Sequence, residues 1–176
     1  PALSLAKKDE LAYELLLKDT YPSWLYTVKN GATTMWERWN SYSPETGPSN
    51  VGDMNSYNHY AFGAVGEWMY ANVAGLDLDP AAPGFRRVRI RPVMGGGLTS
   101  AKARFRSIRG TIASGWTLAN GLLTLDVEVP VHATARVYVP AASADEVREG
   151  GKPAATAPGV KLVGQEGQGS TASVIF

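Results

Sequence analysis

The feature that most constrains this chain is a change in its hydrophobic period near Gly75. Before that glycine, apolar residues recur at helical spacing, as in Leu11, Ala12, Leu15 and Leu16. After it, apolar and polar residues alternate, which is typical of strands in a half-buried sheet. The sequence therefore predicts an α+β chain in which an N-terminal helical segment is followed by an antiparallel β-sandwich.

The domain boundaries follow from this change of period. Three helices are predicted, over residues 8–18, 24–29 and 58–73. The third is apolar on nearly every side, so we expect it to be buried among helices, some of them outside this chain. The predicted organisation is a helical domain at 1–76, a proline-containing linker at 77–84 and a β-sandwich at 85–176.

Short alternating segments define the second half. The predicted strands are 85–91, 101–108, 111–118, 123–129, 135–139, 160–162 and 172–176. Asn120-Gly121, between two of these segments, is a strong hairpin signal. Arginines alternate with apolar residues from Arg86 to Arg109, which favours the solvated faces of strands over a polyanion-binding site. His132 has no evident partner and is expected at the surface.

Composition excludes several classes of function. The apolar fraction of 44% is ample for a core, and the net charge of +1 gives no reason to expect nucleic acid or a membrane as partner. No apolar run approaches the roughly 20 residues of a membrane-spanning helix. The absence of cysteine excludes thiolate chemistry, and two histidines are too few for a histidine-rich metal centre. We therefore expect no metal and no cofactor.

The first residues, Pro1-Ala2-Leu3, carry neither an initiator methionine nor a leader pattern. We expect the chain to be part of a longer polypeptide, which leaves the cellular compartment and the oligomeric state open.

Residues 31–39 concentrate the side chains that a sugar site needs. Trp36 and Trp39 offer ring faces, Glu37 offers a carboxylate that can take a proton from water, and Arg38 can hold hydroxyl groups or influence that carboxylate. The alternative interpretation is a helical turn, capped by a threonine, on which both tryptophans simply pack.

Residues 55–60 form a second cluster, at the start of the third predicted helix. Asn58 and His59 could contact a substrate there, because helix donors and the helix dipole point outward. The alternative is an ordinary helix start, with Ser56 or Asn58 as its cap.

Together these segments resemble the bacterial α-L-rhamnosidase family. The resemblance rests on these segments: Tyr21-Pro22-Ser23-Trp24, Lys29 to Trp39, Met54 to Val65, Pro83-Gly84-Phe85, Ile90-Arg91-Pro92 and Gly95 to Leu98. It spans nearly the whole chain and thins after about Val139. The Trp-Glu-Arg-Trp core with the Asn-His-Tyr segment downstream is its most specific part.

The resemblance implies an (α/α)6 catalytic barrel, incomplete in this chain, followed by a β-sandwich. It also implies inverting removal of terminal α-L-rhamnose from a glycoside or polysaccharide. Glu37 takes the place of the general base and His59 a place in the sugar pocket, with Trp36, Trp39, Arg38 and Asn58 as further substrate-binding candidates.

The proton donor of the family belongs to an upstream segment that this chain lacks, so we expect the missing N-terminal part of the polypeptide to supply it. The nearby carboxylates Glu45, Asp53 and Glu67 match no motif for that role. Two other hypotheses remain: a non-catalytic carbohydrate-binding or structural β-sandwich, and a barrel glycosidase of other sugar specificity.

Overall fold

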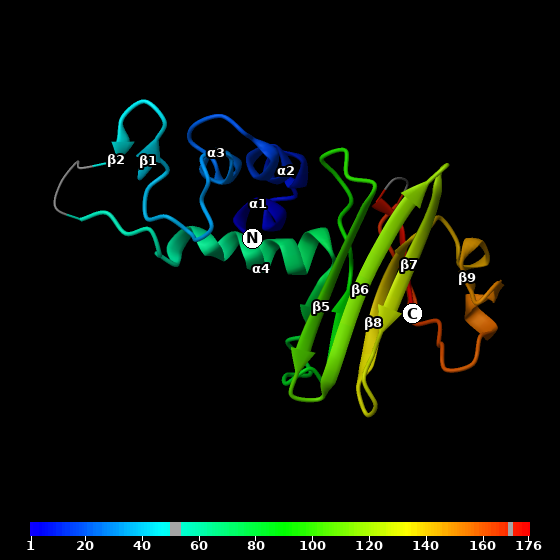
Figure 1. The fold of residues 1–176 in the computed structure, drawn as a ribbon. Helices are drawn as coiled ribbons and strands as arrows, with labels where there is room; N and C mark the ends of the chain where they lie inside the picture. The colour runs from blue at the N-terminus through cyan, green and yellow to red at the C-terminus, as the bar shows by residue number, and fades with distance from the viewer. Residues whose placement is uncertain (50–53, 169–170) are drawn as a thin grey trace. The chain divides into compact units, whose positions relative to one another are not determined.

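The computed structural model describes residues 1–49, 54–168 and 171–176. The chain divides into two compact units, which are described separately below (Figure 1). The first comprises residues 1–69 with 94–98, and the second comprises residues 70–93 with 99–176. Residues 77–84, which the sequence suggested as a linker, lie inside the second unit.

The first unit is built mainly from short helices. They are α1 (Ala2–Leu5), α2 (Asp9–Leu17), α3 (Trp24–Lys29), the 3-10 helix η1 (Ala61–Ala64) and α4 (Val65–Trp68), with a small hairpin of β1 (Tyr42–Ser43) and β2 (Gly47–Pro48). The predicted helices at 8–18 and 24–29 are confirmed. The Ser23 hydroxyl caps α3 by accepting a hydrogen bond from Tyr26 N at 3.0 Å.

The third predicted helix differs from its prediction in start and in burial. It begins at Ala61 rather than near Asn58, and it runs through η1 and α4 into the π-helix η2 (Met69–Val73). It starts late because the backbone before it is paired elsewhere: His59 N donates to Met35 O at 2.7 Å. Trp68 and Val73 are its buried residues, so this chain covers the helix on only part of its circumference, and its burial among further helices stays a prediction.

An aromatic pair organises the core of the first unit. The rings of Tyr13 and Trp68 meet edge to face with centroids 5.1 Å apart, and Trp68 Nε1 donates to Ser4 Oγ at 2.8 Å. Gly95 lies so close to this pair that an added Cβ would come within 2.6 Å of the Tyr13 ring. Because Tyr13 belongs to α2, this close approach shows that the 94–98 segment packs on α2 and that a glycine is needed at the contact.

The second unit contains two larger sheets. Its strands are β3 (Leu76–Leu78), β4 (Arg87–Ile90), β5 (Ser100–Ser107), β6 (Gly110–Ala119), β7 (Leu122–Glu128), β8 (Thr134–Pro140), β11 (Gly164–Glu166) and β12 (Ser173–Ile175). Five of them form a sheet in the order β11-β12-β8-β4-β3, and the other three form a sheet in the order β5-β6-β7. The predicted sandwich is confirmed, with one addition: β4 and β8 pair in parallel.

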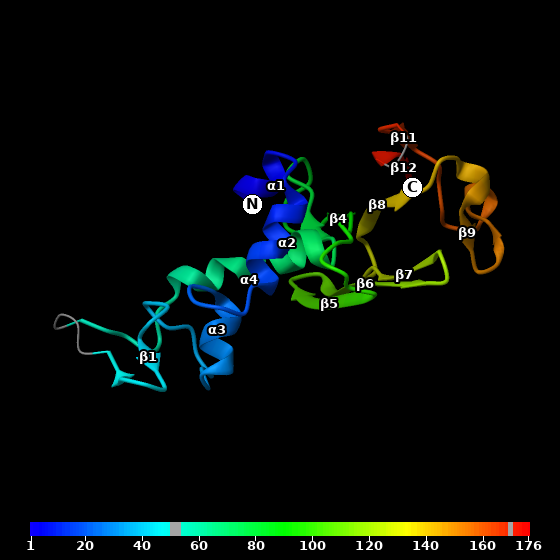
Figure 2. The same ribbon diagram turned by 90° about the horizontal axis from the view of Figure 1, so that it is seen from above.

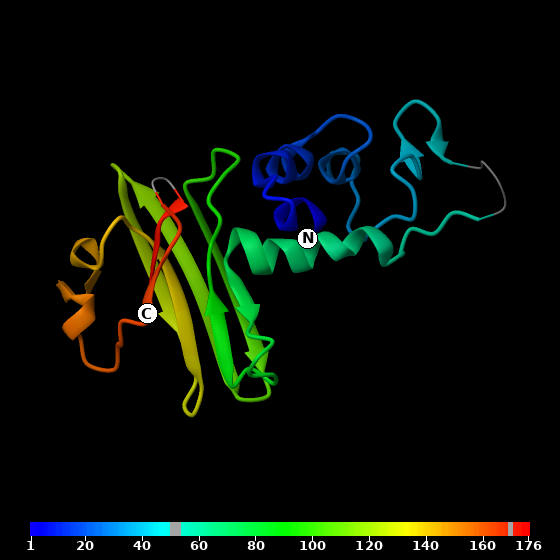
Figure 3. The same ribbon diagram turned by 180° about the vertical axis from the view of Figure 1, so that it is seen from behind.

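A smaller hairpin and two 3-10 turns lie between β8 and β11 in the chain (Figure 3). These elements are η3 (Ala144–Glu146), β9 (Arg148–Glu149), β10 (Lys152–Pro153) and η4 (Ala154–Thr156).

The core of the second unit lies between its two larger sheets, which form two layers in Figure 2. Val88 and Ile90 of β4 and Ile112 of β6 are fully buried, and Leu76 packs with them. Two buried polar groups of β6 are satisfied: Trp116 Nε1 donates to Val73 O at 2.7 Å, and Ser114 Oγ donates to Ala74 O at 2.6 Å. Along β4 and β6, every second residue is buried, so both strands follow the predicted period of two.

The strand predictions hold for most segments and fail for one. Asn120 and Gly121 have φ values of 52° and 75° and turn β6 into β7, as the hairpin signal indicated. Residues 160–162 form no strand, and the edge strand β11 begins at Gly164 instead. An edge strand is held by main-chain pairing with a single neighbour, so apolar alternation does not mark its position.

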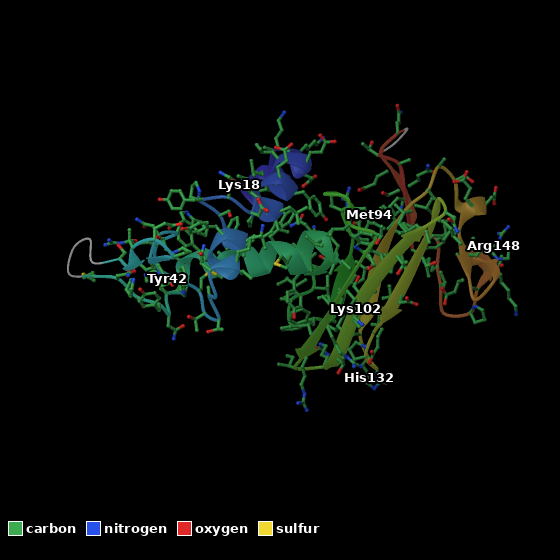
Figure 4. The ribbon with its side chains drawn as sticks, turned by 45° about the horizontal axis from the view of Figure 1, so that its top comes forward. Lys18, Tyr42, Met94, Lys102, His132 and Arg148 are labelled. Carbon is green, nitrogen blue, oxygen red and sulfur yellow. The ribbon has the colours of Figure 1, made fainter. Side chains whose placement is uncertain are left out.

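Several of the arginines on the strands form ion pairs. Arg87 Nε lies 2.5 Å from Asp79 Oδ2, Arg104 pairs with Glu128 at 3.0 Å, and Arg89 pairs with Asp77. This arrangement supports the interpretation as solvated faces. His132 is exposed in the turn between β7 and β8, as expected, and is labelled with Lys102 of β5 in Figure 4.

No helix in the described part of the chain is long and apolar enough to span a bilayer.

Candidate active site

All the predicted site residues lie in the first unit, where two segments of backbone pair. Glu37 N donates to Ser56 O at 2.8 Å, and His59 N donates to Met35 O at 2.7 Å. These bonds join residues 35–37 to residues 56–59, and neither segment is helical. The predicted helical turn around Trp36 is therefore wrong. Thr34, expected as its possible cap, donates instead to Tyr57 O across the pair.

The Glu37 carboxylate is held by the same pairing. Ser56 N donates to Glu37 Oε2 at 2.7 Å, so a single residue binds both the backbone and the side chain of Glu37. The other carboxylate oxygen, Oε1, has no hydrogen-bond partner among the residues that the structure describes. The side chain is half-buried, which leaves one oriented oxygen able to meet water or a ligand.

His59 lies in the segment that pairs with Met35, close in the fold to the Glu37 segment. Its ring stacks on Tyr60 with centroids 5.3 Å apart, and its Nδ1 accepts a hydrogen bond from Ala61 N at 3.3 Å. A neutral imidazole that accepts at Nδ1 carries its proton on Nε2. His59 can therefore offer an Nε2–H donor to a hydroxyl group.

The two tryptophans of the motif have different surroundings. Trp39 stacks on Phe62 with centroids 3.8 Å apart and meets Trp24 edge to face at 5.3 Å. One face of the Trp39 ring is thus covered, and only the other could meet a sugar. Trp36 is buried and meets the edges of Tyr42 and Tyr57 at 6.3 and 5.8 Å.

Trp36 also forms part of the wall of a cavity of about 390 Å³. The residues that line this cavity are Asn30, Gly31, Thr33, Thr34, Trp36, Tyr42, Pro48 and Tyr57. Glu37 and His59 are not among them, so the cavity and the Glu37 carboxylate are separate features of the same loop region.

Serine hydroxyls contact the backbones of Arg38 and Asn58. The Ser41 hydroxyl accepts from Arg38 N at 3.2 Å, and its oxygen lies 2.9 Å from Arg38 O. Asn58 is exposed, and its N donates to Ser56 Oγ at 3.1 Å. The structure thus brings Glu37, Trp36 and His59 onto one paired region, with Asn58 at its margin.

Neither of the two described carboxylates that were considered as proton donors, Glu45 and Glu67, is suited to that role. A hydrogen bond from Ser43 lowers the pKa of Glu45, whereas a general acid needs a raised pKa. Glu67 is exposed in α4, although its helix was predicted to be apolar on nearly every side and buried. Asp53 lies outside the described residues. Within the described ranges, no group of three histidine, aspartate or glutamate side chains could hold a metal ion.

Two contributors were not identified from the sequence. Ser41 is fully buried and links the loop by donating to Asn55 Oδ1 at 2.6 Å and accepting from the Tyr57 hydroxyl at 2.7 Å on its carbonyl. Ser56, considered only as a cap, anchors Glu37 instead. No sequence signal marks either role, because each contact joins residues that are distant in the chain.

A helical unit with an oriented carboxylate among tryptophans, in a chain that continues into a two-layer β domain, agrees with the class that the sequence predicted, a glycosidase with a helical catalytic domain. Models of two domains match the sequence, the bacterial α-L-rhamnosidase six-hairpin glycosidase domain over residues 1–73 and the bacterial α-L-rhamnosidase C-terminal domain over residues 75–154. The chain belongs to the bacterial α-L-rhamnosidase family.

Relatives of known name agree with this assignment. An α-L-rhamnosidase of Streptomyces avermitilis is 46% identical over 148 residues, which are 84% of this chain and 14% of the relative. One from Formosa agariphila is 41% identical over 157 residues, which are 89% of this chain and 17% of the relative. The chain thus spans about a sixth of the relatives' length.

Solved structures show the same likeness. The Streptomyces avermitilis α-L-rhamnosidase complexed with L-rhamnose superposes with a TM-score of 0.80 at 39% identity, covering 100% of this chain and 16% of that one. The native α-L-rhamnosidase of Aspergillus terreus gives 0.72 at 41% identity, covering 78% of this chain and 16% of that one.

Proposed function

We propose that this chain supplies the general base and part of the sugar pocket of an inverting glycoside hydrolase that removes terminal α-L-rhamnose. The observation that carries the proposal is the state of the Glu37 carboxylate. Its Oε2 is anchored by Ser56 N at 2.7 Å, and its Oε1 has no partner in the described part of the chain. An anchored carboxylate with one open oxygen is what activation of a water molecule requires.

In the proposed reaction, Glu37 takes a proton from a water molecule while the water oxygen attacks the anomeric carbon. The bond to the leaving oxygen breaks, and a carboxylic acid on the other side of the sugar protonates that oxygen. Inverting enzymes separate the two carboxyl groups by about 6.5–9.5 Å to admit the water. We place the acid in a part of the enzyme outside this chain.

His59, Arg38 and Asn58 are proposed to contact sugar hydroxyl groups. The Nε2–H of His59 is a directed donor, because its Nδ1 is already engaged by Ala61 N. Trp39 is proposed to offer its uncovered face to the apolar side of a sugar ring, with Phe62 and Trp24 fixing its orientation. Preference for rhamnose rests on the family alone.

The remainder of the polypeptide is proposed as the partner of an apolar groove in the first unit. The groove has a volume of about 310 Å³ and includes Leu15, Leu16, Trp24 and Phe62 in its lining. The chain spans only 14% and 17% of two relatives, and the domain that it matches is named for six hairpins. We therefore propose that further helices of the same enzyme cover this groove.

The test is Glu37→Gln in the full-length gene product that carries this chain, with para-nitrophenyl α-L-rhamnoside as substrate. Loss of a general base lowers kcat by about 10²–10⁴-fold. The matched control is Glu67→Gln, which changes an exposed carboxylate of α4 and is expected to keep turnover near the original value. Proton NMR of the first product should show the β anomer. Near-normal turnover of Glu37→Gln would place the base elsewhere.

A further inference from the structure

We propose that Ser41 is a positioning residue for the general base: it holds the Ser56 amide against the Glu37 carboxylate and so maintains the direction of the open oxygen. The inference rests on the proposed function and adds to it a residue that acts through Glu37 rather than on the substrate. The observation that carries it is a set of hydrogen bonds from Ser41 to residues on both sides of the Glu37–Ser56 contact.

The Glu37–Ser56 contact orients the carboxylate only while the two segments keep their relative position. Glu37 N donates to Ser56 O at 2.8 Å, and Ser56 N donates to Glu37 Oε2 at 2.7 Å. The two residues lie 19 positions apart in the chain, so a shift of the segment around Ser56 would weaken both bonds together. A displacement of about 1 Å in a reacting group can cost about 10²-fold in rate.

Ser41 binds the residues on either side of Ser56. Its hydroxyl donates to Asn55 Oδ1 at 2.6 Å, and its carbonyl oxygen accepts from the Tyr57 hydroxyl at 2.7 Å. The Asn55 side-chain amide also donates to Ser41 O, at 3.3 Å. Ser56 therefore lies between two residues that are both bonded to Ser41.

Ser41 also binds the residue that directly follows Glu37. Arg38 N donates to Ser41 Oγ at 3.2 Å, and Ser41 N donates to Arg38 O at 3.2 Å. One residue thus connects the chain neighbour of Glu37 with both chain neighbours of Ser56. Such an arrangement holds a catalytic side chain more precisely than its own hydrogen bond does.

Burial makes these bonds difficult to replace. Ser41 is 0% exposed, so water cannot substitute for its hydroxyl without a change of packing. The hairpin of β1 and β2 lies between Ser41 and Asn55 in the chain (Figure 1), and the bond between these two side chains closes that stretch at its base. The position of Ser56 beside Glu37 therefore depends on Ser41.

The test is a double-mutant cycle of Ser41→Ala with Glu37→Gln in the full-length gene product, with para-nitrophenyl α-L-rhamnoside as substrate. Ser41→Ala alone should lower kcat by about 10- to 100-fold and leave KM within about twofold, because the base is displaced while the sugar contacts remain. In the Glu37→Gln background, the same change should alter kcat by less than about twofold, since the group through which Ser41 acts is already lost. A loss caused by general damage to the fold would have the same size in both backgrounds.

The matched control for Ser41→Ala is Ser43→Ala, which removes the hydroxyl of an exposed serine that contacts Thr46 within the hairpin. Its kcat and KM should equal those of wild type. Should Ser41→Ala fail to fold, Tyr57→Phe takes its place in the cycle, because it keeps the ring and removes the hydroxyl bond to Ser41 O. Tyr57→Phe should lower kcat by about three- to tenfold, the size expected for one neutral hydrogen bond, whereas Tyr26→Phe on α3 should not.

An equal loss of kcat in both backgrounds overturns the inference and leaves the proposed function standing. A rise in KM with unchanged kcat also overturns it, because Ser41 would then serve substrate binding, and so does wild-type turnover in the Ser41 or Tyr57 variant that folds. Near-normal turnover by Glu37→Gln overturns the proposed function and this inference with it.

Discussion

At the scale of single residues, backbone geometry and burial decide what each side chain can do. Glu37 is oriented by a main-chain amide at position 56, not by a neighbouring charged side chain. Because the Ser56 amide binds Oε2, Oε1 is the oxygen that remains open. The same principle applies to Tyr13, which is 2% exposed in the core of the first unit.

Tyr13 should make stability fall in strongly alkaline solution. Burial, with a smaller contribution from the charge of Asp9, raises the pKa of Tyr13 from 10.0 to about 12. The folded chain therefore holds this proton more tightly than the unfolded chain, so its contribution is complete below pH 10 and is lost as the pH rises toward 12. Urea unfolding of wild type and Tyr13→Phe across this range should show a smaller decline in the variant. Parallel declines would contradict the assignment.

Gly75 should tolerate no side chain. A Cβ at this position would lie 2.1 Å from the backbone N of Pro92, and the residue has a φ of +74°. Gly75→Ala should cost about 3 kcal/mol or more, because backbone must move in addition to the left-handed strain. Gly121→Ala is the matched control: its φ is +75° but nothing lies within 4 Å, so about 1–2 kcal/mol is expected. Equal losses in chemical denaturation would exclude the close approach as the cause.

At the scale of elements, pairing partners override local preference. The segment before Ala61 has a helix-start composition, yet its backbone pairs with residues 35–37. Strand β4 pairs with β8 in parallel, across a long stretch of chain that contains the β5-β6-β7 sheet. Such a connection cannot be recognised from the period of either strand, because inward alternation is the same in both directions.

Ile90 and Ile108 provide a direct test of the layer arrangement. Ile90 on β4 is fully buried between the sheets, whereas Ile108 at the β5–β6 turn is 87% exposed. Ile90→Ala should lower the free energy of unfolding by about 2–5 kcal/mol. Ile108→Ala makes the same chemical change and should stay within about 0.5 kcal/mol of wild type. Comparable losses in thermal or urea unfolding would mean that β4 does not form the core.

At the scale of the whole molecule, the two units differ in how fully each covers its own apolar residues. The second has a core closed by two sheets, with fully buried Val88, Ile90 and Ile112. The first leaves an apolar groove and exposes much of Leu5, Leu11 and Leu15 at its helices. The chain spans 14% and 17% of two named relatives, and this accords with a first unit that needs further helices.

The 176-residue chain by itself should hydrolyse no para-nitrophenyl α-L-rhamnoside. The two described carboxylates near Glu37 in the sequence that were considered as proton donors are unsuited to that role, since the pKa of Glu45 is lowered and Glu67 is exposed. Release of nitrophenol is the measurement, with the full-length gene product as the positive control. Measurable turnover by the chain alone would show that both carboxyl groups lie within it.

The sequence alone indicated the helical first half, the β-rich second half and a resemblance to the family that the comparisons show. The change of period near Gly75, the helix at 24–29 and the Asn120-Gly121 hairpin depend on local chemistry, so they could be predicted and were confirmed. The motif around Glu37 identified the candidate site because the resemblance joined segments whose separate meanings were ambiguous.

Only the tertiary structure decided which groups meet. The anchoring of Glu37 by Ser56, the cavity beside Trp36 and the parallel pairing of β4 with β8 each join residues distant in the chain. Contacts of this kind depend on which distant segments the fold brings together. The hydrophobic period indicates the type of an element and not its neighbours in space. Local chemistry therefore determined most of the helices and strands, whereas long-range packing determined the site and the exceptions among the elements.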